Sequence, residues 1–137
     1  MENLLSREGL LAKEKLKVER VNLNETDYVF VRQMTGRERD IFERSLYTMD
    51  RENKVTTRLE DFRAKLAVCT LCDDQGKLLL QPNDYTILSQ NMSASRLEKI
   101  VNAAQKLNAI TEEDKEALVK NSDAGQPGFL PSDSVEN

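Results

Sequence analysis

The chain has 137 residues, a length that fits one domain with a modest core and leaves no room for a second. Its 20 basic and 24 acidic residues are interleaved, so no basic stripe is present to neutralise a phosphate backbone, and we expect no nucleic-acid partner. Histidine is absent, which removes Ser-His and Cys-His nucleophiles and the commonest metal ligand.

The apolar residues are spread in short groups along the chain. No run approaches the roughly 20 residues that cross a bilayer, and the N-terminus lacks a basic region followed by an apolar stretch. We therefore expect a soluble, cytoplasmic protein without a membrane partner. Because no Gly-rich phosphate loop and no paired catalytic carboxylates can be identified, we also expect no enzymatic activity and no cofactor.

Residues 1–14 carry four leucines among charged residues, a pattern that fits a short amphipathic helix or a frayed arm. Such a segment either packs locally on its own domain or docks on a partner. The candidate partner-binding residues are Leu4, Leu5, Leu10 and Leu11.

The next segment is predicted to form an antiparallel hairpin. Residues 15–23 alternate between apolar and charged, but the alternation shifts by one position, which predicts a strand with an irregularity near Glu19 and Arg20. Residues 22–26 supply turn formers, and residues 28–34 are the richest in β-branched and aromatic side chains.

A capping box at Thr35 and Glu38 predicts the start of a helix, and the polar segment 50–54 places its end near Met49 or soon after. Helical spacing resumes from Thr57. Residues 67–72 are either the last turns of that second helix or a buried strand that pairs, through a turn at 73–76, with residues 77–80. The Asp-Asp-Gln-Gly sequence of this turn favours the strand, which would make a second short hairpin.

Cys69 and Cys72 have the spacing of a redox or zinc pair. Zinc requires four ligands, and the chain has neither a further cysteine nor a histidine. A redox pair normally opens a helix, whereas these residues end an apolar stretch. We therefore interpret both as small buried or half-buried side chains rather than as a metal or catalytic site.

The C-terminal third is predicted to be helical. Pro82 starts a short helix through Leu88, a loop follows at 89–93, and a longer helix starts near Ser93 or Ser95 and runs to Leu107. A last helix begins at Thr111 and ends near Lys120. The fold class is therefore α+β: an N-terminal arm (1–14), a single, mainly helical domain (15–122) and a disordered, polar tail (123–137).

The order of these elements resembles the tail assembly chaperones of long-tailed bacteriophages. The resemblance spans residues 14–122, and three segments carry it: Met34 to Glu43, where a strand leads into a capped helix; the Asp-Asp-x-Gly-Lys turn from Asp73 to Lys77; and Leu-Asn-x-Ile-Thr-Glu-Glu with Lys-Asn-Ser, from Leu107 to Ser122. None of these motifs is catalytic.

The resemblance implies a protein that binds the tape measure protein in the bacterial host cytoplasm, keeps it soluble, and helps the tail tube protein to polymerise around it. It also implies that the chaperone is not retained in the mature virion and that a longer form arises by translational frameshifting. Self-association is expected along the same apolar surfaces. The alternatives are a small cytoplasmic adaptor or regulatory protein, and a redox protein centred on Cys69 and Cys72.

Overall fold

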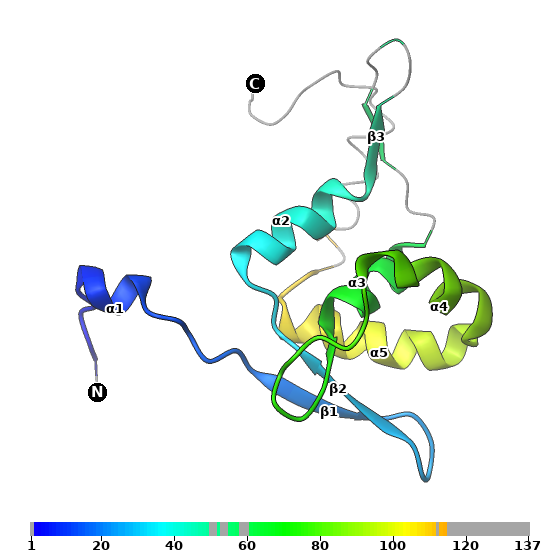
Figure 1. Ribbon diagram of the computed structural model, residues 1–137, viewed down its shortest axis with the longest axis horizontal. Helices are drawn as coiled ribbons and strands as arrows, with labels where there is room; N and C mark the ends of the chain where they lie inside the picture. Colours follow the sequence, from blue (N-terminus) through cyan, green and yellow to red (C-terminus); the bar gives the residue numbers. More distant parts are fainter. Residues whose placement is uncertain (1, 50–51, 53–54, 58–60, 112, 115–137) are drawn as a thin grey trace.

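The computed structural model describes residues 2–49, 52, 55–57, 61–111 and 113–114. It has an α+β fold, as the sequence predicts, in which helices pack against a small antiparallel sheet (Figure 1). In chain order the elements are α1 (Arg7–Leu11), β1 (Val18–Asn22), β2 (Tyr28–Arg32), α2 (Gly36–Arg44), β3 (Tyr47–Met49), β4 (Val55–Thr57), α3 (Phe62–Thr70), β5 (Leu71–Cys72), the 3-10 helix η1 (Pro82–Asp84), α4 (Tyr85–Asn91) and α5 (Ala94–Leu107).

The N-terminal hairpin is confirmed, but the irregularity predicted within its first strand is wrong. β1 and β2 pair without interruption, from Val18 opposite Arg32 to Asn22 opposite Tyr28. The apolar alternation shifts because β1 places apolar residues on both of its faces: Val21 is buried, whereas Val18 is 39% exposed. A regular strand can carry apolar residues on both faces without a bulge, since successive side chains point to opposite sides of the sheet.

The first capped helix is also confirmed, and it ends earlier than predicted. Thr35 and Glu38 form the reciprocal capping box that opens α2, and the helix stops at Arg44 rather than near Met49. Residues 47–49 instead form β3, which pairs with β4. The expected helix start at Thr57 is wrong for the same reason, because Thr57 lies in β4 and α3 begins at Phe62.

The predicted strand over residues 67–72 is wrong for its first four residues. α3 continues to Thr70, and only Leu71 and Cys72 are extended. An apolar run without alternation is typical of a buried strand, but it is equally typical of a helix that is buried on most sides. α3 is a helix of this kind. The predicted turn at 73–76 is confirmed: the Asp73 N–H donates to the Lys77 carbonyl at 2.8 Å, and Cys72 forms an isolated bridge with Leu78.

The core lies between the sheet and the helices. β5 adds to β2, so the sheet order is β1-β2-β5, and α5 packs on β1, β2 and α3. The largest fully buried apolar side chains belong to β2, α3, α5 and the segment after α2. They are Val31, Leu66, Ile100, Val101 and Leu46. Phe42 of α2 meets Phe62 of α3 edge-on, with their ring centroids 5.6 Å apart.

The C-terminal elements are confirmed as far as the structure describes them. η1 and α4 form the short helix predicted after Pro82, although α4 extends to Asn91 into the expected loop, and Ser93 caps α5. Thr111 and Asp114 exchange hydrogen bonds as the start of a further helix would. The remainder of that predicted helix and the tail at 123–137 lie outside the described residues. Within the described part of the chain, no helix is long and apolar enough to cross a membrane.

Candidate protein-interaction surface

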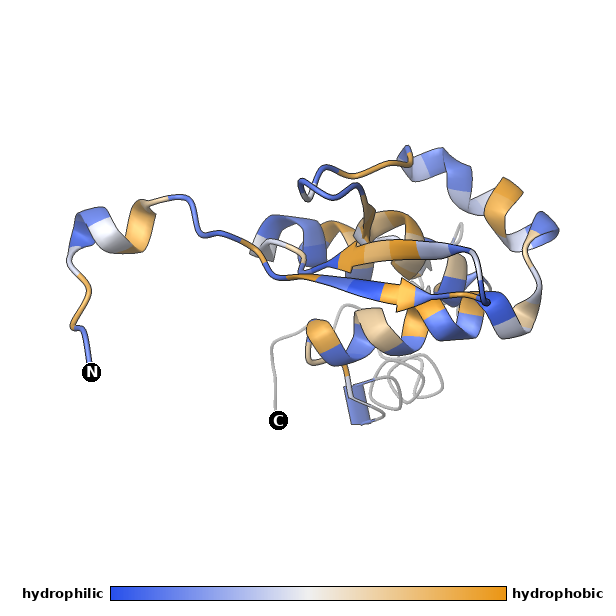
Figure 2. Ribbon diagram, turned by 90° about the horizontal axis from the view of Figure 1, so that it is seen from below, coloured by the Kyte–Doolittle hydropathy of each residue, from blue (hydrophilic) through white to orange (hydrophobic). Residues whose placement is uncertain are grey.

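The four leucines selected from the sequence lie together on an N-terminal arm outside the core. Their exposed fractions are 101% for Leu4, 55% for Leu5, 68% for Leu10 and 69% for Leu11. Every described residue from 2 to 15 is exposed, and the arm projects away from the sheet and helices (Figures 1 and 2). The structure therefore gives these leucines no packing role within the domain.

Local contacts shape the arm. Ser6 caps α1, its Oγ accepting the Gly9 N–H at 3.2 Å, and the helix contains only five residues. A helix this short is marginal in water without tertiary packing. Leu10 and Leu11 belong to the helix, whereas Leu4 and Leu5 precede its cap. The arm thus offers two pairs of leucines separated by one short polar segment, and exposed apolar side chains grouped in this way mark interaction sites.

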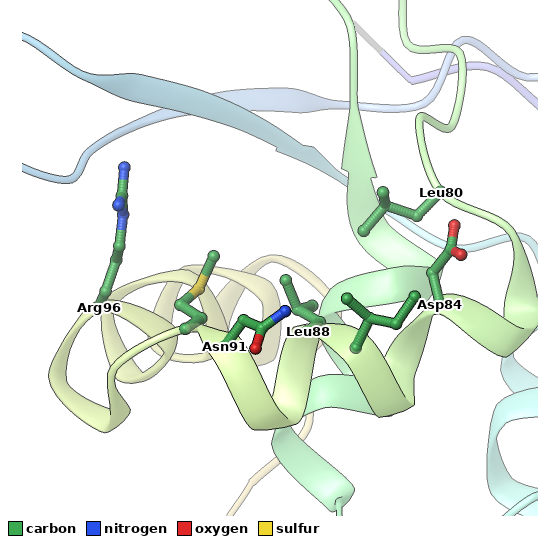
Figure 3. A pocket seen from close by; sticks show the side chains of 7 residues that line it. Leu80, Asp84, Leu88, Asn91 and Arg96 are labelled. Atoms are coloured by element: carbon green, nitrogen blue, oxygen red, sulfur yellow. The ribbon is translucent and has the colours of Figure 1, made fainter.

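A second apolar surface lies along α4, and the sequence did not identify it. We call it the α4 groove, an open depression of about 440 Å³ between the loop before η1, α4 and the start of α5 (Figure 3). Its apolar lining consists of Leu80, Ile87, Leu88 and Met92. Ile87 is 60% exposed although it is apolar. The adjacent pair Ile87 and Leu88 gives no signal of it in the sequence, because neighbouring apolar residues on a helix can both face one core, as Ile100 and Val101 of α5 do.

Polar groups of opposite charge lie at the two ends of the α4 groove, Asp84 at one and Arg96 at the other (Figure 3). Oδ2 of Asp84 accepts the Gln81 N–H at 2.7 Å. Nη2 of Arg96 lies 3.4 Å from Oδ2 of Asp27, a long ion-pair distance. Nε of Arg96 is buried and has no hydrogen-bond partner among the described residues. A buried donor of this kind is costly to leave unpaired, so an acceptor on a bound segment would be favoured here.

The two cysteines lie at the junction of α3 and β5. Cys69 is half-buried on α3, Cys72 is buried in β5, and both thiols are free. Burial raises the pKa of both thiols, and the nearby Glu38 carboxylate raises that of Cys69 further. A raised pKa disfavours the thiolate that redox chemistry and metal binding require. In the described part of the chain, no group of three or more Cys, Asp or Glu residues could hold a metal ion.

Comparison with known proteins adds no relatives: no family model, no curated protein and no solved structure matches this chain.

Proposed function

We propose that this protein is a tail assembly chaperone of a long-tailed bacteriophage, which acts by protein–protein interaction without catalysis. Its client is the tape measure protein, which it keeps soluble in the bacterial host cytoplasm while the tail tube protein polymerises around it. The chaperone then leaves before the virion is complete. The resemblance in the segments Met34 to Glu43, Asp73 to Lys77 and Leu107 to Ser122 supplies this identification of the client.

The observation that carries the proposal is the leucine-bearing arm. Leu4, Leu5, Leu10 and Leu11 are exposed on a segment that makes no part of the core. A long helical client presents apolar stripes that must be covered before assembly, and leucines on a short helix are suited to cover them. The charged residues between and beside the leucines keep the free arm in solution.

Co-expression with the tape measure protein of the same phage tests the proposal. We expect the wild-type chain to hold the client in the soluble fraction. A variant with Leu4, Leu5, Leu10 and Leu11 all changed to Ser should lose most of this capacity and keep its fold, because all four side chains are exposed. Leu79→Ser is the matched control, since Leu79 is 58% exposed but lies outside the arm.

A small adaptor or regulatory protein is the alternative from a different class, because exposed leucines serve any apolar partner equally well. The co-expression result separates the two: an adaptor binds its own partner and leaves the tape measure protein insoluble. The raised thiol pKa values give a redox role for Cys69 and Cys72 no support. Retention of client solubility by the four-serine variant would place the binding surface elsewhere and remove the arm from the proposal.

A further inference from the structure

We propose that the α4 groove of one molecule receives the N-terminal arm of a second copy, so that the protein self-associates by arm exchange. The inference rests on the proposed role of the arm leucines in protein binding and names a receptor for them. It joins two apolar features of the described surface, the arm leucines and the groove lining around the exposed Ile87.

The arm and the α4 groove match in length. From Leu4 to Leu11 the arm combines a short extended stretch with a five-residue helix, a length of about 14 Å. The groove runs along α4, whose seven residues span about 10 Å (Figure 3). Its volume of about 440 Å³ accommodates several leucine side chains, and it lies in the range of ordinary binding pockets.

The charges favour one direction of the arm. The arm leucines are preceded by Glu2 and followed by Lys13, so the apolar segment has an acidic and a basic flank. The groove has Arg96 at one end and Asp84 at the other (Figure 3). An arm that enters with Glu2 toward Arg96 pairs its acidic flank. The basic flank at Lys13 then lies on the side of Asp84, beyond the groove, because the two flanks are about 27 Å apart along the arm. This direction also brings carboxylate and backbone oxygens to the side of the groove where the buried Nε of Arg96 lacks an acceptor.

A second copy fits this site better than the molecule's own arm. The arm leaves the domain at β1, on the side away from α4 (Figure 1). The six residues 12–17 that join α1 to β1 reach at most about 20 Å when fully extended. An arm from a neighbouring molecule is not held by this linker. Each copy carries one arm and one groove, so exchange between two copies closes a two-fold dimer and leaves no free arm.

Light scattering on the purified protein, without client, tests arm exchange. The wild-type mass should rise with concentration toward a dimer. Ile87→Glu places a charge in the groove at an exposed position, and the four-serine arm variant removes the inserted leucines. Each change should raise the dissociation constant of the dimer by about tenfold or more, because the loss of burial of one leucine side chain lowers the affinity by about that factor. Leu79→Glu, the same kind of change at similar exposure outside the groove, should leave the mass unchanged.

Mixing the two variants gives the sharpest result. The arm variant keeps an intact groove and the Ile87→Glu variant keeps an intact arm, so the mixture should form a one-to-one complex although neither variant dimerises alone. Circular dichroism of each variant confirms that the fold is retained. A wild-type chain that remains monomeric at every concentration, an Ile87→Glu variant that associates like wild type, or a mixture that stays monomeric would each overturn the proposal.

A charge reversal tests the direction of the arm. Arg96→Glu should weaken self-association, and mixing it with a chain that carries Glu2→Arg should restore a complex; absence of that restoration overturns the pairing of Glu2 with Arg96. These measurements contain no tape measure protein. Failure of arm exchange therefore leaves the proposed chaperone function untouched, and failure of client solubilisation leaves arm exchange untouched.

Discussion

Arg32 links the N-terminal hairpin to the helix that follows it. Only 8% of the residue is exposed, and its Nη2 donates to Oε2 of Glu38 at 2.7 Å. Glu38 also completes the capping box of α2 with Thr35. Burial by itself raises the pKa of Glu38, but hydrogen bonds from Thr35 and Arg32 outweigh it and hold the pKa below its ordinary 4.5. One carboxylate thus serves both as a cap and as the counterion of a buried arginine.

Replacing Glu38 with Gln should lower the free energy of unfolding by about 1 to 3 kcal/mol at neutral pH, because the buried Arg32 loses its counterion. Since the folded pKa of Glu38 is lowered, its contribution is complete above the ordinary carboxyl pKa and is lost as the pH falls through the folded value. Urea denaturation of both proteins at neutral pH and in acid checks this. A difference that persists undiminished in strong acid would contradict it.

The cysteines give a second prediction at the residue scale. A Cys69→Ala, Cys72→Ala double variant should lose about 1 to 3 kcal/mol of stability, because it removes sulfur atoms from a half-buried and a buried position. It should still bind the client. Denaturant unfolding and the co-expression assay measure the two effects separately, and stoichiometric zinc in the purified wild-type protein would refute this interpretation.

At the scale of elements, Asn108 connects α5 to the start of α2. Its Oδ1 accepts the Met34 N–H at 2.6 Å, and its Nδ2 donates to the Ala104 carbonyl at 2.9 Å and, at 3.4 Å, to the Arg32 carbonyl. Arg39 of α2 donates to the Asn108 backbone carbonyl at 2.9 Å. The last turn of α5 and the link between β2 and α2 are therefore fixed to each other through one side chain and its backbone.

Asn108→Ala should destabilise the domain by about 1 to 3 kcal/mol, because the Met34 N–H loses its acceptor in a partly buried place. Asn102→Ala is the matched control: it makes the same change at an exposed position of the same helix, where a small gain from helix propensity is expected. Thermal unfolding compares the two. Equal melting temperatures would show that the Asn108 contacts do not couple α5 to α2.

Local signals predicted the elements that depend on local chemistry. The hairpin followed from the β-branched and aromatic residues at 28–34, and the start of α2 followed from its capping box. The prediction failed at α3, where burial on most sides removes the alternation that separates strands from helices. It also missed β3 and β4, because three-residue strands are too short for a periodic pattern.

At the scale of the whole molecule, one part of the candidate site can be predicted from the sequence and the other cannot. The arm leucines were found because Leu4, Leu5, Leu10 and Leu11 lie close together in sequence and outside any strong periodic element. The α4 groove was not found, because it forms only when Leu80, α4 and the start of α5 come together in the fold. Its oppositely charged ends depend on the same arrangement, so neither residue composition nor spacing reveals them.

The arm contributes nothing to the core, and this leads to a prediction for the domain. Deleting residues 1–14 should leave the melting temperature within experimental error at a concentration where the wild-type protein is monomeric, because none of the described residues removed is buried. Solubilisation of the tape measure protein should be lost in the same variant. A clear drop in melting temperature would show that the arm packs on its own domain.

Amide hydrogen exchange of the arm, with and without the tape measure protein, tests the central claim most directly. In the free protein, diluted until it is monomeric, the backbone of residues 4–11 should exchange rapidly, because a five-residue helix with exposed leucines is marginal alone. With client bound, the same amides should become protected by about tenfold or more, whereas the exposed Asn24–Asp27 turn should not change. Client binding without protection of the arm would contradict the account.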